Sequence, residues 1–197
     1  MDHAATASDH HYTATGLETW KLGFWTFIGS ETLFFGSMIG SYLAYKGKSV
    51  TGPFPSDVFD IWLTTLSTFV LLMSSLNMVL ALAATQRGDR KGSILWLAMT
   101  ALFGMIFLGF QAYEFTHFAS AGLGFGTNLF SSTFYVLTGF HGAHVTVGIF
   151  WLLTLLIHAI RGKLGPADAL KVEVAGLYWH FVDVVWIIIF TFIYLLD

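Results

Sequence analysis

Six ionisable side chains lie inside long apolar stretches of this sequence, where proton or metal chemistry would have to be carried out. They are Glu31, Glu114, His141, His144, His180 and Asp183. A charged side chain at the centre of a bilayer costs at least about 2.5–3.5 kcal/mol. We therefore predict that these groups engage one another or a neighbouring subunit, and that they do not face bare lipid.

Glu31 lies about twelve residues into the first apolar stretch, which is about 18 Å along a helix and near mid-depth. Phe34 and Phe35 follow it, so its surroundings are apolar. Two interpretations stay open: a carboxyl group linked to proton movement or to a partner, or a neutral or paired acid that is hydrogen-bonded between helices. Gly36 and Gly40 form a small-xxx-small face, which predicts that another helix approaches closely there.

His141 and His144 are three residues apart, so a helix places both on one face and a metal ion is conceivable. A zinc site would need further ligands, and the chain contains no Cys. Haem with two axial histidines would need them on opposite sides of its ring, which one helix face does not supply. We therefore expect no metal site, and predict buried histidines in a hydrogen-bond network between helices.

His180 and Asp183 also share one helical face. A buried Asp is rare unless it is paired, and an imidazole is a natural partner. We expect both residues to face the interior of a helix bundle, with a neighbouring subunit or a lipid headgroup as the alternative target.

Gln111, Glu114 and His117 form a third polar face, near the end of an apolar stretch. Their position near a membrane surface makes ordinary solvation or headgroup contact the expected explanation for this cluster.

The elements that position these residues are five segments, each long enough to cross a bilayer as a helix. Crossing takes about 20 mostly apolar residues at 1.5 Å per residue. The chain is 55% hydrophobic and only 11% charged, against about 25% charged in soluble domains. We predict an all-α, polytopic membrane protein with a polar N-terminal tail, 1–18, and one five-helix domain, 19–197, whose spans are residues 19–45, 60–86, 92–118, 131–160 and 174–196.

Basic residues predict the orientation of this bundle. Seven of them fall on the side of the N-terminus and only Lys46 and Lys48 on the other, which favours a cytoplasmic N-terminus and a periplasmic C-terminus. A net charge of −3 and the lack of a Lys or Arg run argue against a nucleic-acid partner. The histidines of the tail are interpreted as solvated residues.

Four motifs resemble subunit III of haem-copper terminal oxidases, the cytochrome c oxidase subunit 3 family, in a short five-helix bacterial form. They are Trp25-x5-Glu31-x2-Phe34-Phe35, Gly109-Phe110-Gln111-x2-Glu114, residues 134–145 (FYVLTGFHGAHV) and residues 178–186 (YWHFVDVVW). The last two are long and specific, and the resemblance covers nearly everything from Trp20 to Leu196. Mitochondrial-type members have seven helices, and the N-terminal pair of that plan is missing here.

The resemblance implies a non-catalytic subunit that packs mainly against subunit I, with subunit II as a further partner. Such a subunit supports assembly, stability and proton uptake while the complex passes electrons to oxygen and pumps protons. Haem and copper belong to the partner subunits, so no residue of this chain is expected to act catalytically or to bind metal. The six residues named first match the buried polar positions of the family.

The resemblance also implies a place in the membrane. A structural phospholipid is expected in a cleft between helices, at residues the motifs do not identify, although the missing pair is one wall of that cleft. The location expected from the resemblance is the inner (plasma) membrane of a bacterium, which the chain crosses several times.

Other functions compete with this one. An accessory membrane protein of nitric oxide reductase resembles subunit III and has a similar helix count. A small transporter would tend to show internal repeats and broken helices, and no Pro interrupts any span here. A cytochrome with two His ligands would need histidines on opposite sides of the haem, which the single helix face of His141 and His144 does not supply. The electron donor, cytochrome c or quinol, stays open because its site lies on other subunits.

Overall fold

The computed structural model describes residues 19–48 and 60–196, and the side chains from residue 21 onward within them. These ranges contain no strand, which confirms the all-α prediction with its five helices. The predicted tail, 1–18, lies outside the described residues. The α-helices are α1 (Thr19–Tyr45), α3 (Ile61–Gln86), α4 (Arg90–Ser120), α5 (Leu129–Ile160) and α6 (Ala169–Phe190). A 3-10 turn, η1 (Pro166–Asp168), precedes α6, and a π-helical turn, η2 (Thr191–Leu195), extends it.

Side-chain caps fix where several helices begin. Asp60 accepts a hydrogen bond from the backbone N–H of Leu63, and Asp89 accepts one from Gly92. Asn128 and Ser131 form a reciprocal capping box at the start of α5. These caps satisfy N–H groups that the first turn of a helix leaves unpaired. Gly88, with φ of +72°, ends α3 in the left-handed conformation that glycine adopts without steric cost.

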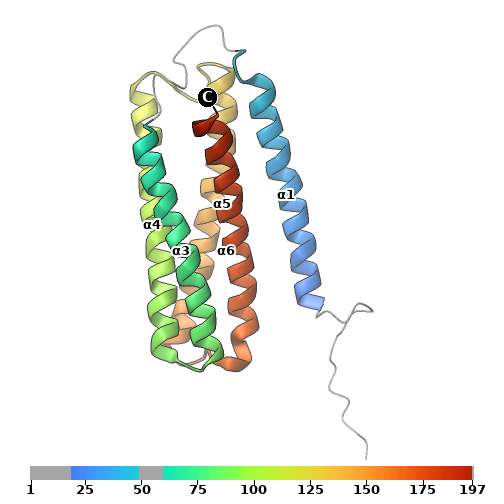
Figure 1. The fold of residues 1–197 in the computed structure, drawn as a ribbon, viewed down its shortest axis with the longest axis vertical. Helices are drawn as coiled ribbons and strands as arrows, with labels where there is room; N and C mark the ends of the chain where they lie inside the picture. The colour runs from blue at the N-terminus through green and yellow to red at the C-terminus, as the bar shows by residue number, and fades with distance from the viewer. Residues whose placement is uncertain (1–18, 49–59, 197) are drawn as a thin grey trace, which may run out of the picture.

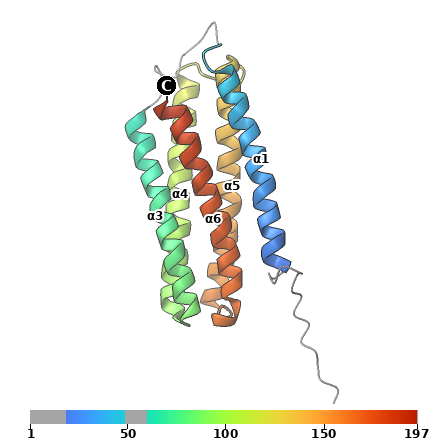
Figure 2. The ribbon, with the colours of Figure 1, turned by 45° about the vertical axis from the view of Figure 1, so that its right-hand side comes forward.

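The helices form an antiparallel bundle with α1 on its outside (Figure 1). α3 packs against α4, α4 against α5, and α6 against both α3 and α5. α1 packs on α5 and α6 (Figure 2). The bundle therefore has a compact four-helix core of α3 to α6, to which the first helix is attached along one side.

Four helical segments in the described ranges are long and apolar enough to cross a membrane: α3, α4, α5 and the continuous Pro166–Leu195 segment. This last segment begins at Pro166, whereas the sequence predicted that the fifth span begins at residue 174. α1 has 27 residues and a length of about 40 Å. It is not among the segments that are apolar enough to cross, because Glu31 and several Gly, Ser and Thr residues interrupt its apolar stretch. Its passage across the membrane therefore stays a prediction.

One end of the bundle collects most of the basic residues. The start of α4 and the end of α5 meet there, because Arg90 donates hydrogen bonds from Nε to the carbonyl of Ala159 (3.1 Å) and from Nη2 to that of Ile160 (2.6 Å). α1 begins at the same end, where Lys21 pairs with Glu173 of α6 at 2.9 Å. At the opposite end, Lys46 Nζ donates to the carbonyl of Leu196. The charge asymmetry in the sequence is therefore an asymmetry between the two ends of the fold.

Candidate functional site: polar contacts between helices

Glu31 and His144 join α1 to α5. Glu31 Oε2 lies 3.2 Å from His144 Nε2, and both side chains are about one-fifth exposed. His144 Nδ1 lies 2.7 Å from the carbonyl oxygen of Phe140, so Nδ1 carries a proton and donates it. Nε2 then either donates to a carboxylate, as imidazolium, or accepts from a neutral carboxyl group.

His141 lies in a different environment, although it is only three residues from His144. Its ring is completely buried, stacked on Trp186 at 4.9 Å between centroids and edge-on to Phe107 at 5.8 Å. Neither ring nitrogen has a hydrogen-bond partner among the described residues. The hydrogen-bond network expected for this histidine is therefore not found, because its position on α5 turns it toward the aromatic side chains of α4 and α6.

Ser75 of α3 lies between the two polar residues of α6. Its Oγ is 2.9 Å from His180 Nδ1 and donates a hydrogen bond to Asp183 Oδ2. Asp183 is only 3% exposed. The direct pairing of His180 with Asp183 that the sequence suggested is thus replaced by a serine bridge from the neighbouring helix.

Glu114 is buried, not solvated as we had expected from its position near a helix end. Its Oε1 accepts hydrogen bonds from Thr64 Oγ1 of α3 at 3.0 Å and from the hydroxyl of Tyr194 in η2 at 3.1 Å. Gln111, one turn away, donates from Nε2 to the carbonyl of Thr138 in α5 at 2.7 Å. His117 is exposed and lies outside this contact. Glu114 therefore ties three helical segments together.

The side chains that sequence reasoning missed are the hydroxyl groups of α3. Besides Thr64 and Ser75, Thr68 accepts a hydrogen bond from the indole N–H of Trp186 at 2.9 Å, and Ser74 accepts one from that of Trp179 at 2.8 Å. All of these partners lie on other helices. The signal for them was the presence of Ser and Thr at intervals along an otherwise apolar span.

These contacts connect helices and leave few groups for other chemistry. In the described parts of the chain, no three His, Asp or Glu side chains gather in a way that would hold a metal ion. All six ionisable residues except His141 contact a side chain on a different helix. The arrangement stabilises a membrane-embedded bundle by satisfying polar groups inside it.

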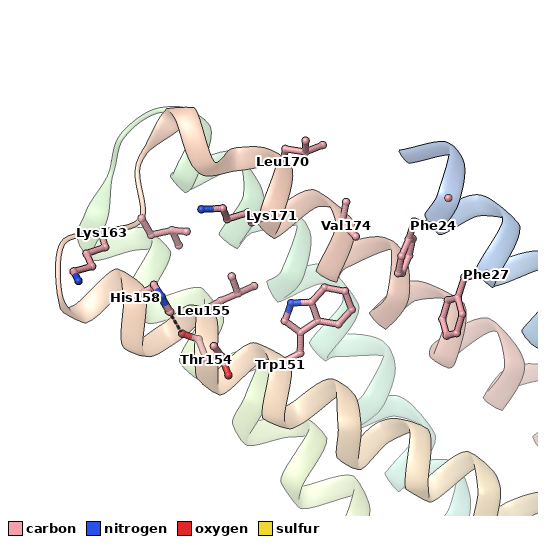
Figure 3. A pocket seen from close by; sticks show the side chains of 12 residues that line it. Phe24, Phe27, Trp151, Thr154, Leu155, His158, Lys163, Leu170, Lys171 and Val174 are labelled. Carbon is pink, nitrogen blue, oxygen red and sulfur yellow. Dashed lines mark hydrogen bonds between the residues drawn. The ribbon is translucent and has the colours of Figure 1, made fainter. Parts of the chain in front are cut away.

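A pocket of about 980 Å³ opens between α1, α5 and the start of α6, at the basic end. Figure 3 shows its aromatic wall of Phe24, Phe27 and Trp151. His158, Lys163 and Lys171 also line it, and Lys171 is paired with Asp168 at 2.7 Å. An apolar wall beside cationic groups suits a molecule with a hydrocarbon part and an anionic part.

The sequence profile of the family described as cytochrome c oxidase subunit III matches residues 1–197. The chain belongs to this family. It is similar to the third subunits of cytochrome c oxidases and quinol oxidases over most or all of both chains. Cytochrome c oxidase subunit 3 of Alkalihalophilus pseudofirmus is 43% identical over 176 residues, which are 89% of this chain and 85% of the relative. Quinol oxidase subunit 3 of Bacillus spizizenii is 38% identical over 199 residues, 100% of this chain and 98% of the relative.

A further subunit III relative, cytochrome c oxidase subunit 3 of Bacillus subtilis, is 41% identical over 176 residues, 89% of this chain and 85% of the relative. The relatives thus carry the names of both cytochrome c and quinol oxidases. Membership of subunit III agrees with the resemblance drawn from the sequence motifs, and places the chain in an oxidase complex of the membrane.

Proposed function

We propose that this chain is the non-catalytic subunit III of a bacterial haem-copper terminal oxidase, bound mainly to subunit I and also to subunit II. In this role it supports assembly, stability and proton uptake while the complex reduces oxygen and pumps protons. Haem and copper are held by the partner subunits. The chain lies in the plasma membrane with its N-terminus in the cytoplasm and its C-terminus outside, and α1 crosses the membrane with the other helices.

One observation supports this role more than any other: the ionisable groups inside the bundle are mostly engaged in contacts between helices. Glu31 pairs with His144, Asp183 with Ser75, and Glu114 with Thr64 and Tyr194. A redox or hydrolytic centre needs such groups free to meet a substrate or a cofactor. A scaffold needs such groups engaged between its helices, and this is the arrangement of all six ionisable residues except His141.

A phospholipid in the pocket between α1, α5 and α6 fits the same role. The aromatic wall suits an acyl chain, and Lys163 and Lys171 suit an anionic headgroup. The pocket lies at the basic end of the bundle, which the proposal assigns to the cytoplasmic side.

Oxidase preparations with and without this chain test the supporting role. Complex lacking the chain should begin turnover at a similar rate, then lose oxygen consumption within the assay while the complete complex continues. Equal lifetimes would contradict the role. The alternative, an accessory protein of nitric oxide reductase, predicts that the complex that co-purifies with the chain reduces nitric oxide in preference to oxygen.

A further inference from the structure

His180 uses one ring nitrogen inside the bundle and presents the other at the bundle surface. Nδ1 contacts Ser75 Oγ at 2.9 Å. Nε2 has no hydrogen-bond partner in residues 19–48 and 60–196. It is not among the unpaired polar atoms that are buried, so it is accessible at the surface of the bundle. The ring is half-buried, in contrast to the completely buried ring of His141.

The serine bridge favours one tautomer of His180. Ser75 Oγ has a single proton and donates it to Asp183 Oδ2, so it accepts from His180 Nδ1–H. A neutral imidazole protonated at Nδ1 has a free lone pair at Nε2. The exposed edge of the ring is therefore a hydrogen-bond acceptor that is held in a fixed orientation.

The surface around this acceptor is apolar. Val184 and Ile187 follow His180 on the same face of α6 and are 53% and 40% exposed. Leu76, next to Ser75 on α3, is 53% exposed. Figure 2 shows this part of α6 with α3 on one side and α1 on the other. His180 lies about 17 Å from the start of α6, which is within the hydrocarbon layer when the helix crosses the membrane.

We propose that this face of α6 is a contact surface for a membrane helix of a partner subunit, whose side chain donates a hydrogen bond to His180 Nε2. Acyl chains have no donor, and headgroups lie nearer the membrane surface. The fitting donors are a hydroxyl, an amide N–H or an indole N–H. A second copy of this chain docked symmetrically on the same face would bring one acceptor toward another, which disfavours it as the occupant. The proposal rests on the proposed function, because it requires an oxidase partner.

Two substitutions of similar size separate the inner contact of His180 from the outer one. In His180→Asn the amide group occupies the position near Nδ1, so the contact with Ser75 is kept and the outer acceptor is removed. In His180→Gln the amide group reaches the position of Nε2, so the outer acceptor is kept. The apparent dissociation constant of the chain from the haem-containing complex is measured by native mass spectrometry during dilution in mild detergent.

His180→Asn should raise this constant about threefold to twentyfold, the range for a hydrogen bond between membrane helices, and His180→Gln should leave it within about twofold. Circular dichroism melting of each variant chain shows whether the fold is kept. Phe150→Ala, on an exposed part of α5, serves as the control and should bind as the wild type does.

The contact would be overturned if His180→Asn bound as tightly as the wild type. It would also be overturned if both variants bound more weakly in proportion to their loss of fold stability. The proposed function would stand in either case. A dimer of this chain that His180→Asn dissociates would assign the surface to a second copy, and would overturn the partner proposal. A wild-type chain that binds no haem-containing partner would contradict the proposed function itself, and the oxidase contact with it.

Discussion

The indole nitrogen of Trp179 donates a hydrogen bond of 2.8 Å to the hydroxyl of Ser74, deep between α6 and α3. Trp179 is 1% exposed, so this bond lies where neither water nor lipid reaches it. The ring also fills the space beside Gly104 of α4 and Gly148 of α5. A single side chain thus connects all four helices of the bundle core.

Removing the hydroxyl of Ser74 should destabilise the bundle, because the buried indole N–H then has no acceptor. We expect Ser74→Ala to lower the free energy of unfolding by about 1–2 kcal/mol. The measurement is thermal or denaturant unfolding in detergent micelles, followed by circular dichroism. In a Trp179→Phe background the same Ser74 substitution should cost much less, since no indole N–H remains. An equal cost in both backgrounds would show that the bond does not contribute.

The glycines beside Trp179 should resist any larger side chain. A Cβ atom at Gly104 would lie 2.6 Å from the indole Cη2, and one at Gly148 would lie 2.8 Å from Cζ3. Gly148→Ala should therefore destabilise the bundle by about 1–3 kcal/mol through overpacking. Gly139 lies on the same helix, and a Cβ atom there would meet no atom within 4 Å, so Gly139→Ala should be neutral or stabilising by up to about 1 kcal/mol. Equal effects at the two positions would contradict this packing.

The Glu31–His144 pair should show energetic coupling. A double-mutant cycle with Glu31→Gln and His144→Gln should give a coupling energy of about 0.5–2 kcal/mol in detergent unfolding. The Lys21–Glu173 pair is the matched control, because it also attaches α1 to the bundle but is about one-third exposed at the helix ends. Its coupling should be about 0–1 kcal/mol and should fall as salt is added. A coupling energy of zero for Glu31 and His144 would mean that the two side chains lie close together without stabilising the bundle.

Tyr194→Phe should cost about 1 kcal/mol, since it removes one donor from buried Glu114. Glu114→Ala should cost more, because it leaves the hydroxyls of Thr64 and Tyr194 without their acceptor. Tyr113→Phe removes a hydroxyl from a side chain that is 60% exposed, and should stay within about 0.5 kcal/mol of the wild type. Unfolding curves of the three variants under one set of conditions give the comparison, and an equal cost for both tyrosines would exclude a stabilising role for the Glu114 contact.

Charge removal at the pocket should release anionic phospholipid. Purified chain carrying Lys163→Gln and Lys171→Gln should retain severalfold less anionic lipid than the wild type, as quantified by lipid extraction and mass spectrometry. Lys91→Gln changes a basic residue that lies outside the pocket lining at the same end of the bundle, and should leave the lipid content unchanged. Equal retention in the double variant and the control would remove the pocket as a specific lipid site.

The helices and their number could be predicted from the sequence because each must satisfy its own backbone in lipid, which leaves a strong apolar signal. Residues 134–145 and 178–186 carried the family resemblance for a related reason, since they hold the buried polar and aromatic groups of the core. The partners of those groups could not be predicted. Ser75 and Thr64 are common residue types, and only the packing of α3 against α4 and α6 assigns them to Asp183 and Glu114.

His141 illustrates the same limit in the opposite direction. Its spacing from His144 suggested a shared network, yet a step of three residues rotates the side chain by about 60° around the helix. That rotation is enough to place one ring against Glu31 of α1 and the other among the aromatic rings of Phe107 and Trp186. Periodicity places a residue on a face, whereas its partner depends on which helix covers that face.

Affinity purification through this chain, followed by visible absorption spectroscopy, tests the proposed function most directly. Mild-detergent extracts should yield a complex with haem absorption and copper that consumes oxygen, and stripping the chain from it should leave all of the haem with the other subunits. A chain that purifies without any haem-copper partner, or that keeps a Soret band of its own after separation, would contradict the account.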